Sequence, residues 1–205
     1  MEDRLLELMA ARHGHFEFES GHHGELWLDI PRLFVRPEKL RPFAMELASR
    51  LSETGAAMVV GPAVEGALLA QIVAEIASLE FGFADRIVSR TTSGEVTVDY
   101  QIPRALRQFI QGKRVAVVDD VVNAGSAILA TLKNLTDIGA VPVVLGTLLA
   151  LGESAALLAS THQLTFVAIA HRDNRLWEPA DCPLCATGVP LDGPCEVSRI
   201  PRDST

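Results

Sequence analysis

The 205-residue chain has few cysteines, no excess of positive charge and no long apolar run. Three cysteines are an odd number and do not form the paired framework of a small secreted protein, so a reducing, cytoplasmic setting is expected. With 18 basic against 26 acidic side chains, the net charge of −8 argues against non-specific nucleic-acid binding. The most apolar stretch, residues 141–151, is too short to span a membrane. The acidic, amphipathic start of the chain predicts a first helix rather than a signal peptide.

The 48% apolar and 21% charged content that remains is typical of a globular enzyme. Short apolar runs alternate with helical patterns along most of the chain. Strands are expected at residues 56–60, 81–90, 115–118, 141–150 and 164–170, and helices at 37–51, 64–78, 126–138 and 153–159. This alternation predicts a mainly parallel five-stranded sheet flanked by helices, in a single α/β domain over residues 1–205. Residues 91–103 are polar and are expected to form a hairpin or flap, whereas residues 1–36 and 171–205 would add a small hood and tail.

Residues 115–127, VAVVDDVVNAGSA, are the most informative segment. An apolar strand leads into Asp119 and Asp120, and a turn of small side chains around Gly125 precedes a helix. A helix N-terminus presents free N–H groups and the positive end of a dipole, so the turn predicts an anion site. Ionised carboxylates accept hydrogen bonds from a sugar diol, and a diol beside a phosphate indicates a ribose 5-phosphate. The alternative is an ordinary surface turn that the two aspartates cap.

This segment resembles the phosphoribosyl pyrophosphate (PRPP) signature of type I phosphoribosyltransferases. The resemblance extends over nearly the whole chain and is closest to orotate phosphoribosyltransferase-like proteins, through residues 16–29, 60–66 and 182–191. It implies the type I phosphoribosyltransferase fold and transfer of the 5-phosphoribosyl group from PRPP to a nitrogen base. It also implies Mg²⁺ carried on PRPP, a homodimer, and a place in nucleotide metabolism such as pyrimidine biosynthesis.

The same resemblance implies a set of site residues. Asp119 and Asp120 would grip the ribose hydroxyls at the catalytic centre, and Arg90 would be a cation of the flap. The residues that would bind the 5-phosphate are Val121, Val122, Asn123, Ala124, Gly125, Ser126 and Ala127. Those that would line the pyrophosphate are Pro62, Ala63, Val64, Glu65 and Gly66. Those that would cover the base are Ser20, Gly21, His23 and Trp27. No metal ligand is predicted within this set.

The chain departs from the family pattern where positive charge is usual. Glu19 and Glu65 stand at positions that are usually basic, residues 91–95 contain no lysine or histidine, and the strand-end arginine near residues 151–154 is missing. Two like charges about 4 Å apart repel by roughly 4 kcal/mol at an effective dielectric constant near 20. Another base is therefore expected in preference to orotate. Two compensations are open: Mg²⁺ held by Glu65 or Glu19, or cations from a second subunit, for which the candidates are Arg104, Arg107, Lys113 and Arg114.

Two further functions remain as alternatives. One is a non-catalytic protein that senses PRPP or a nucleoside monophosphate, and the other is a nucleotide or sugar-phosphate hydrolase in which water replaces the base. Both keep the small-molecule ligand and neither involves nucleic acid or a membrane.

Histidines and cysteines outside the signature give weaker signals. His13, His15, His22 and His23 are interpreted mainly as exposed loop residues, with base recognition as the alternative. Cys182, Cys185 and Cys195, with His171 as a fourth ligand, form a candidate zinc set. A tail packed on the core through Trp177 and Leu184 is the preferred interpretation.

Overall fold

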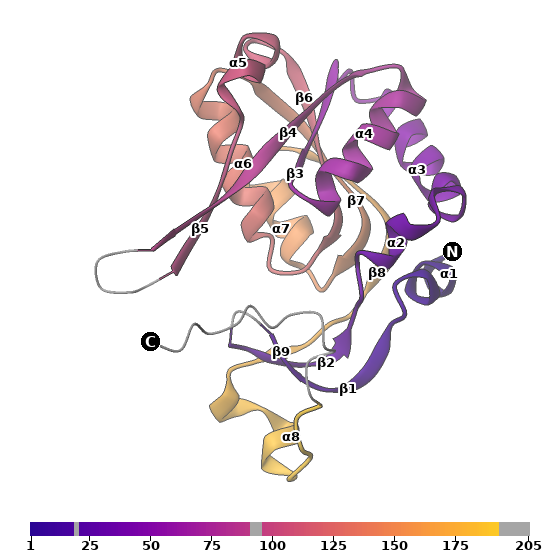
Figure 1. Ribbon diagram of the computed structural model, residues 1–205, viewed down its shortest axis with the longest axis vertical. Helices are drawn as coiled ribbons and strands as arrows, with labels where there is room; N and C mark the ends of the chain where they lie inside the picture. The colour runs from indigo at the N-terminus through magenta and orange to yellow at the C-terminus, as the bar shows by residue number, and fades with distance from the viewer. Residues whose placement is uncertain (19–20, 91–95, 193–205) are drawn as a thin grey trace.

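The computed structural model describes residues 1–18, 21–90 and 96–192. It has two parts: a large α/β body and a small hood that lies beyond one end of the sheet (Figure 1). Within the described residues, no helix is both long and apolar enough to cross a bilayer.

A six-stranded sheet forms the centre of the body, in the order β5-β4-β3-β6-β7-β8. Its strands are β3 (Met58–Pro62), β4 (Glu80–Arg90), β5 (Val96–Gln101), β6 (Arg114–Val122), β7 (Val141–Leu151) and β8 (Thr165–Arg172). Neighbours pair in parallel, except that β5 runs antiparallel to β4. The five predicted strands are all present, and the sixth, β5, lies in the segment that was expected to form a flap.

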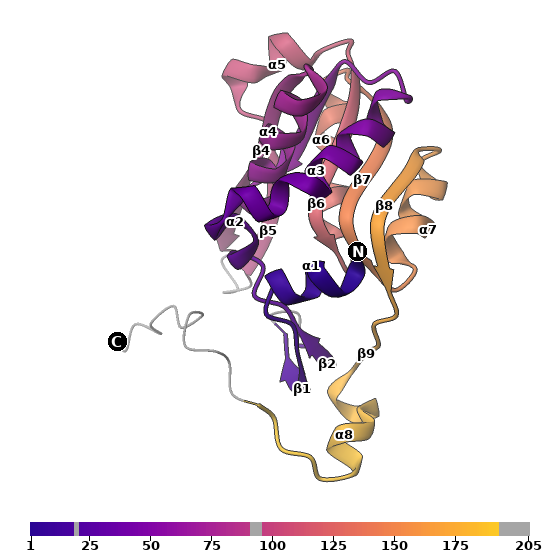
Figure 2. The same ribbon diagram turned by 90° about the vertical axis from the view of Figure 1, so that its right-hand side faces the viewer.

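Helices cover both faces of this sheet (Figures 1 and 2). One face carries α1 (Glu2–Leu8), α2 (Arg32–Val35), α3 (Pro37–Ser52) and α4 (Glu65–Ala77), and the other carries α5 (Arg104–Ile110), α6 (Ser126–Asp137) and α7 (Ser154–Thr161). The central strand β6 is therefore buried on both faces, which explains its unbroken apolar run from Val115 to Val118. The four predicted helices are present with ends within two residues of the expected positions.

The hood joins the two ends of the chain. Its small sheet has the order β1-β2-β9, from β1 (Arg12–Glu17), β2 (His23–Trp27) and β9 (Leu176–Trp177). The short turn η1 (Pro179–Asp181) and helix α8 (Pro183–Ala186) follow. The predicted first helix is shorter than expected: it ends at Leu8, Ala10 has a φ of 46°, and the chain then enters β1.

Candidate functional site at the carboxyl end of the sheet

The two aspartates lie near the carboxyl end of β6, the central strand. β6 does not end at Val118 as predicted, because Val121 and Val122 continue the parallel pairing with β7. Asp120 is only 4% exposed and Asp119 is half-buried. The backbone N–H of Asp120 donates to Asp119 Oδ1 (3.1 Å), and the N–H of Val121 donates to Asp120 Oδ1 (2.7 Å). Both carboxyl groups are thus fixed by the backbone of their own strand.

The loop between β3 and α4 packs directly against this pair. A Cβ at Gly66 would lie 2.5 Å from Asp119 Oδ1 and 2.9 Å from Pro62 Cδ, so only glycine permits this approach. A Cβ at Gly61 would similarly lie 2.2 Å from the carbonyl oxygen of Gly66. The peptide bond between Ala63 and Val64 is cis. The loop therefore presents its backbone, rather than bulky side chains, to the acidic pair.

Loop and acids together form a small cleft of about 120 Å³. Its lining residues are Pro62, Ala63, Val64, Glu65, Gly66, Tyr100, Asp119, Asp120, Val121 and Ala127. The structure thus brings together all five residues predicted for the pyrophosphate loop, both aspartates, and two of the seven residues predicted for the 5-phosphate turn. A volume of this size holds a group such as a phosphate, whereas whole ligands usually occupy roughly 300 Å³ or more.

The cleft has a strongly negative electrostatic character. Burial, the neighbouring Asp120 and the more distant Glu65 raise the pKa of Asp119 well above its usual value. Burial, with a further contribution from Glu65, raises the pKa of Asp120 to about 7. The backbone hydrogen bonds oppose these shifts but do not cancel them. Such a pair keeps a proton near neutral pH unless a cation enters.

The turn after β6 leads into the N-terminus of α6. Gly125 immediately precedes α6 as its N-cap residue. It has a φ of 80°, a conformation that glycine adopts without strain. The first N–H groups of a helix have no partner within the helix, so those of α6 are available to an anion beside the cleft. Asn174, which follows β8, donates from Nδ2 to Asn123 Oδ1 (3.3 Å) and ties the turn to the start of the tail.

Tyr100 is a cleft residue that the sequence interpretation missed. It lies on β5 and is half-buried, and burial raises the pKa of its hydroxyl, which is also hydrogen-bonded to Arg86. Residues 91–103 were expected to form a hairpin or flap, and nothing in the sequence indicated that Tyr100 on its second strand would reach the cleft. Arg90, the predicted flap cation, is exposed where β4 pairs with the start of β5 and does not line the cleft.

Three of the four residues predicted to cover the base are described, and they lie in the hood. Gly21 occupies the turn between β1 and β2 with a φ of 78°. Trp27 stacks on Phe18 with 6.2 Å between ring centroids and an interplanar angle of 5°. His23 is 6% exposed and its ring faces His15 and Cys185, and His15 is also buried, so the expectation of exposed loop histidines is wrong for both. Ser20 and Glu19 lie outside the described residues.

Three of the four spare cations are engaged elsewhere in the chain. Arg114 donates to the carbonyl groups of Thr54 (2.9 Å) and Gly55 (3.0 Å), and Lys113 pairs with Glu80. Arg107 donates from Nε to the carbonyl of Ile102 (3.1 Å). Lys113 precedes β6 and Arg114 is its first residue, so both lie at the opposite end of the strand from the aspartates. Neither residue reaches the cleft within one chain.

Comparisons with known proteins agree with this geometry. Residues 41–168 match the phosphoribosyl transferase domain family. An orotate phosphoribosyltransferase of Thermotoga maritima is 29% identical over 187 residues, which cover 90% of this chain and 91% of the relative. One from Caldanaerobacter subterraneus is 27% identical and covers 88% of each chain.

Solved structures show the same fold. The orotate phosphoribosyltransferase of Aeropyrum pernix superposes with a TM-score of 0.64 and 23% identity, over 83% of this chain and 93% of that one. The adenine phosphoribosyltransferase of Thermoanaerobacter pseudethanolicus gives a TM-score of 0.63 at 15% identity, over 84% and 100% of the two chains.

The body therefore has the type I phosphoribosyltransferase fold, and its relatives are enzymes of the glycosyltransferase class. The chain belongs to the phosphoribosyl transferase domain family, since the match covers more than half of it.

Proposed function

We propose that the cleft binds PRPP and that the protein transfers its 5-phosphoribosyl group to a nitrogen base other than orotate. One observation carries this proposal: an acidic pair, a close-packed backbone loop and a helix N-terminus meet at one end of the sheet. These three parts match the diol, the pyrophosphate and the 5-phosphate of PRPP.

Each part has one role in the proposed reaction. Asp119 and Asp120 accept hydrogen bonds from the ribose hydroxyls and stabilise the positive charge that develops on the sugar as its bond to pyrophosphate breaks. Residues 123–127 hold the 5-phosphate at the start of α6. Residues 62–66 line the pyrophosphate, and the hood, with Gly21 and Trp27, covers the base.

The cleft fits a divalent cation carried on the substrate. Three carboxylates, from Asp119, Asp120 and Glu65, share the lining, and carboxylate oxygens are ligands that Mg²⁺ accepts. Burial is the main cause of the raised pKa values of the two aspartates, and the neighbouring carboxylates add to it, so a cation that entered the cleft would favour their ionised forms. When bound, Mg²⁺ would neutralise pyrophosphate charge, and Glu65 would be placed to hold it where related proteins have a basic residue.

The choice of a base other than orotate rests on charge. Orotate carries a carboxylate, and the strand-end arginine that the family uses for it is missing near residues 151–154. The carboxylates of the neighbouring cleft would in addition repel that group. A neutral base avoids this repulsion. We expect the same preference in a homodimer, unless the partner subunit supplies cations.

The experiment is a base screen with the full chain, PRPP and Mg²⁺, read by mass spectrometry for nucleotide and by an assay for released pyrophosphate. The proposal expects a nucleotide product with at least one neutral base and a much slower reaction with orotate. A fastest reaction with orotate would refute the choice of base. Release of ribose 5-phosphate without any base would instead identify a hydrolase.

A PRPP-sensing protein without transferase activity is the second candidate, and Glu65 in the pyrophosphate loop favours it. Negative charge builds up on the pyrophosphate as its bond to the sugar breaks. A negative side chain in the loop therefore weakens stabilisation of the leaving pyrophosphate more than it weakens binding of PRPP in the ground state. Tight PRPP binding with no product from any base would support this function over transfer.

A further inference from the structure

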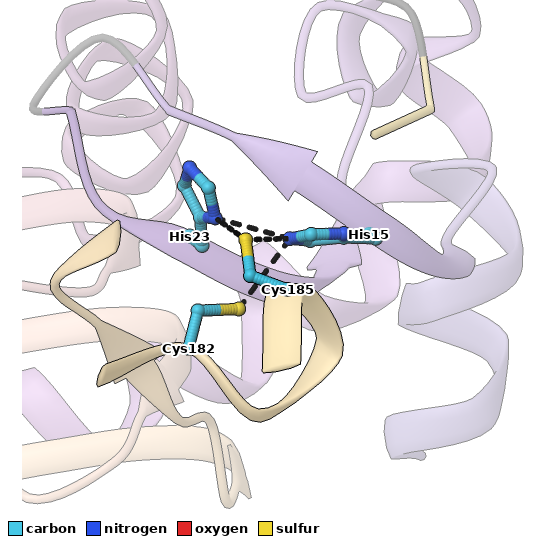
Figure 3. Close-up of side chains that lie close together, drawn as sticks. All are labelled: His15, His23, Cys182 and Cys185. Atoms are coloured by element: carbon cyan, nitrogen blue, oxygen red, sulfur yellow. Dashed lines mark hydrogen bonds between the residues drawn. The ribbon is translucent and has the colours of Figure 1, made fainter. Parts of the chain in front are cut away.

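Two histidines and two cysteines from opposite ends of the chain converge in the hood. His15 lies on β1 and His23 on β2, whereas Cys182 immediately precedes α8 and Cys185 lies within it. Figure 3 shows the four side chains pointing toward one another. Their ligand atoms all lie within 4.8 Å of one another, and His15, His23 and Cys182 are buried. Nothing in the phosphoribosyl cleft accounts for this cluster.

The distances within the cluster match a tetrahedral metal site. His15 Nε2 lies 3.0 Å from His23 Nδ1, 3.4 Å from Cys182 Sγ and 3.7 Å from Cys185 Sγ. Cys185 Sγ lies 3.3 Å from His23 Nδ1. With metal–sulfur bonds of about 2.3 Å and metal–nitrogen bonds of about 2.0 Å, the edges of a tetrahedron are roughly 3.3 to 3.8 Å. The four atoms therefore surround a space of the right size for one ion.

The hydrogen bond of His15 to the backbone of Val189 favours the imidazole tautomer that a metal ion requires. Its Nδ1 lies 2.8 Å from the carbonyl oxygen of Val189, which can only accept, so Nδ1 carries the proton and Nε2 has a lone pair. Three possible donors, His23 Nδ1, Cys182 Sγ and Cys185 Sγ, lie close to this one lone pair. A single lone pair cannot accept hydrogen bonds from all three. A cation at the centre bonds to all four atoms at once. Orientation of a ligating imidazole by a backbone carbonyl is usual at metal sites.

Within the described residues, the tail is otherwise held against the hairpin by short elements and a few polar contacts, among them the pair of His22 with Glu178 (3.0 Å). β9 pairs with β2 through two residues only, and α8 is four residues long. Asp192 adds two hydrogen bonds, from the backbone N–H of His15 to its Oδ2 (2.9 Å) and from its own N–H to the carbonyl of His15 (2.7 Å). Segments this short are marginal on their own, so a metal would supply much of their folding free energy.

We propose that His15, His23, Cys182 and Cys185 bind one zinc ion, which fastens the C-terminal tail to the N-terminal hairpin. Two thiolates and two imidazoles are a ligand set that suits zinc, and four protein ligands close the coordination sphere, as in structural rather than catalytic sites. The ion holds the hood in shape over the end of the sheet. This inference does not depend on the base that the cleft accepts.

The ligand set differs from the one considered from the sequence. His171 donates from Nε2 to the carbonyl oxygen of Gly152 (2.9 Å) and is not part of the cluster. Cys195 lies outside the described residues. These two residues therefore provide matched controls: Cys195→Ser for the cysteines and His171→Gln for the histidines.

The test is metal analysis of the full chain, purified without a metal-affinity tag and desalted. We expect about one zinc ion per chain in the wild type. Cys185→Ser, at an exposed position, and His15→Gln should lose it, whereas Cys195→Ser and His171→Gln should retain it.

Cobalt replacement of the metal gives a second readout that needs no variant. Co²⁺ bound to the wild type should give the intense visible absorption of a tetrahedral site and a thiolate charge-transfer band. A wild type that neither contains zinc nor takes it up from solution would overturn the proposal. Loss of the metal in Cys195→Ser to the same extent as in Cys185→Ser would overturn the ligand set.

Discussion

The phosphoribosyl cleft and the histidine–cysteine cluster differ in how the chain assembles them. The cleft is built mainly from two strand ends and the turns that follow them, β3 with residues 62–66 and β6 with residues 119–127. The cluster joins residues up to 170 positions apart, through a hairpin and a four-residue helix. The cleft is held by the buried parallel sheet, whereas we infer that the cluster is held by its metal. The activity of the cleft should therefore depend on the identity of its aspartates and glycines. The stability of the hood should depend on the four metal ligands.

The largest effect is expected from the acidic pair. Asp119→Asn or Asp120→Asn keeps the shape but removes the charge that faces the ribose, so transfer should fall by roughly 100-fold or more. Asp137→Asn, an exposed change at the far end of α6, is the matched control and should keep full activity. The measurement is kcat/KM for PRPP with the best base from the screen. Equal losses in all three variants would show that the aspartates have no special role.

Removal of the proposed zinc should affect the hood and spare the body. With a chelator present, amide hydrogen exchange in β1, β2 and β9 should become about 10-fold faster or more, because the local opening free energy falls. Exchange in β6 and β7, at the centre of the sheet, should stay unchanged. Exchange that rises equally in both regions would contradict the separation of the two parts.

A smaller effect is expected at the glycine that touches the acids. In Gly66→Ala the new methyl group would meet Asp119 Oδ1 and Pro62, so the loop must shift at a cost of about 1 to 3 kcal/mol. KM for PRPP should rise, while zinc content stays the same. Gly112→Ala is a useful comparison, because nothing lies within 4 Å of its Cβ and its positive φ of 76° costs stability only. A Gly66→Ala variant with unchanged KM would mean that the loop does not contact the substrate.

The smallest effect concerns pH. The pKa of Asp120 is about 7 in the folded protein against 3.8 ordinarily, so the folded state binds more protons between these values. The contribution of Asp120 to the free energy of unfolding is complete below about pH 4 and is lost as the pH rises through 7. The expected loss is roughly 2 kcal/mol, because water that enters the cleft reduces the cost of burying the charge. Denaturant titrations from pH 5 to pH 8 should show this decline in the wild type and a flatter profile in Asp120→Asn.

Glu65→Gln sharpens the same measurement. Because Glu65 raises the pKa of Asp119 and of Asp120, its neutralisation should move the decline to lower pH. Parallel profiles in all three proteins would show that these carboxyl groups do not set the pH dependence.

The fold and the site could be predicted from the sequence where the relevant residues are adjacent in the chain. The strand, acids and turn of residues 115–127 form one continuous signal, and the central strands β3, β6 and β7 follow from apolar runs that are buried on both faces. The loop at residues 62–66 could be placed beside the acids because parallel strands present their carboxyl ends at one edge.

The sequence was insufficient where distant or polar segments meet. A hairpin or flap was predicted at residues 91–103, and β5 does pair antiparallel with β4, but the place of Tyr100 in the cleft was not recognised, because an edge strand has no continuous apolar pattern. His171 was the histidine considered as a candidate ligand with Cys182 and Cys185, yet His15 and His23 are the histidines beside them. The pairing of β2 with β9 and the hydrogen bonds between His15 and Asp192 bring these distant segments together, and no local spacing encodes such contacts.

The most direct test of the central claim is calorimetric titration of the full chain with PRPP, with and without Mg²⁺. The account predicts binding that requires Mg²⁺ and that weakens in Asp119→Asn while it persists in Asp137→Asn. A wild type that binds no PRPP under either condition, but still binds a nucleoside monophosphate, would contradict the assignment of the cleft to phosphoribosyl transfer.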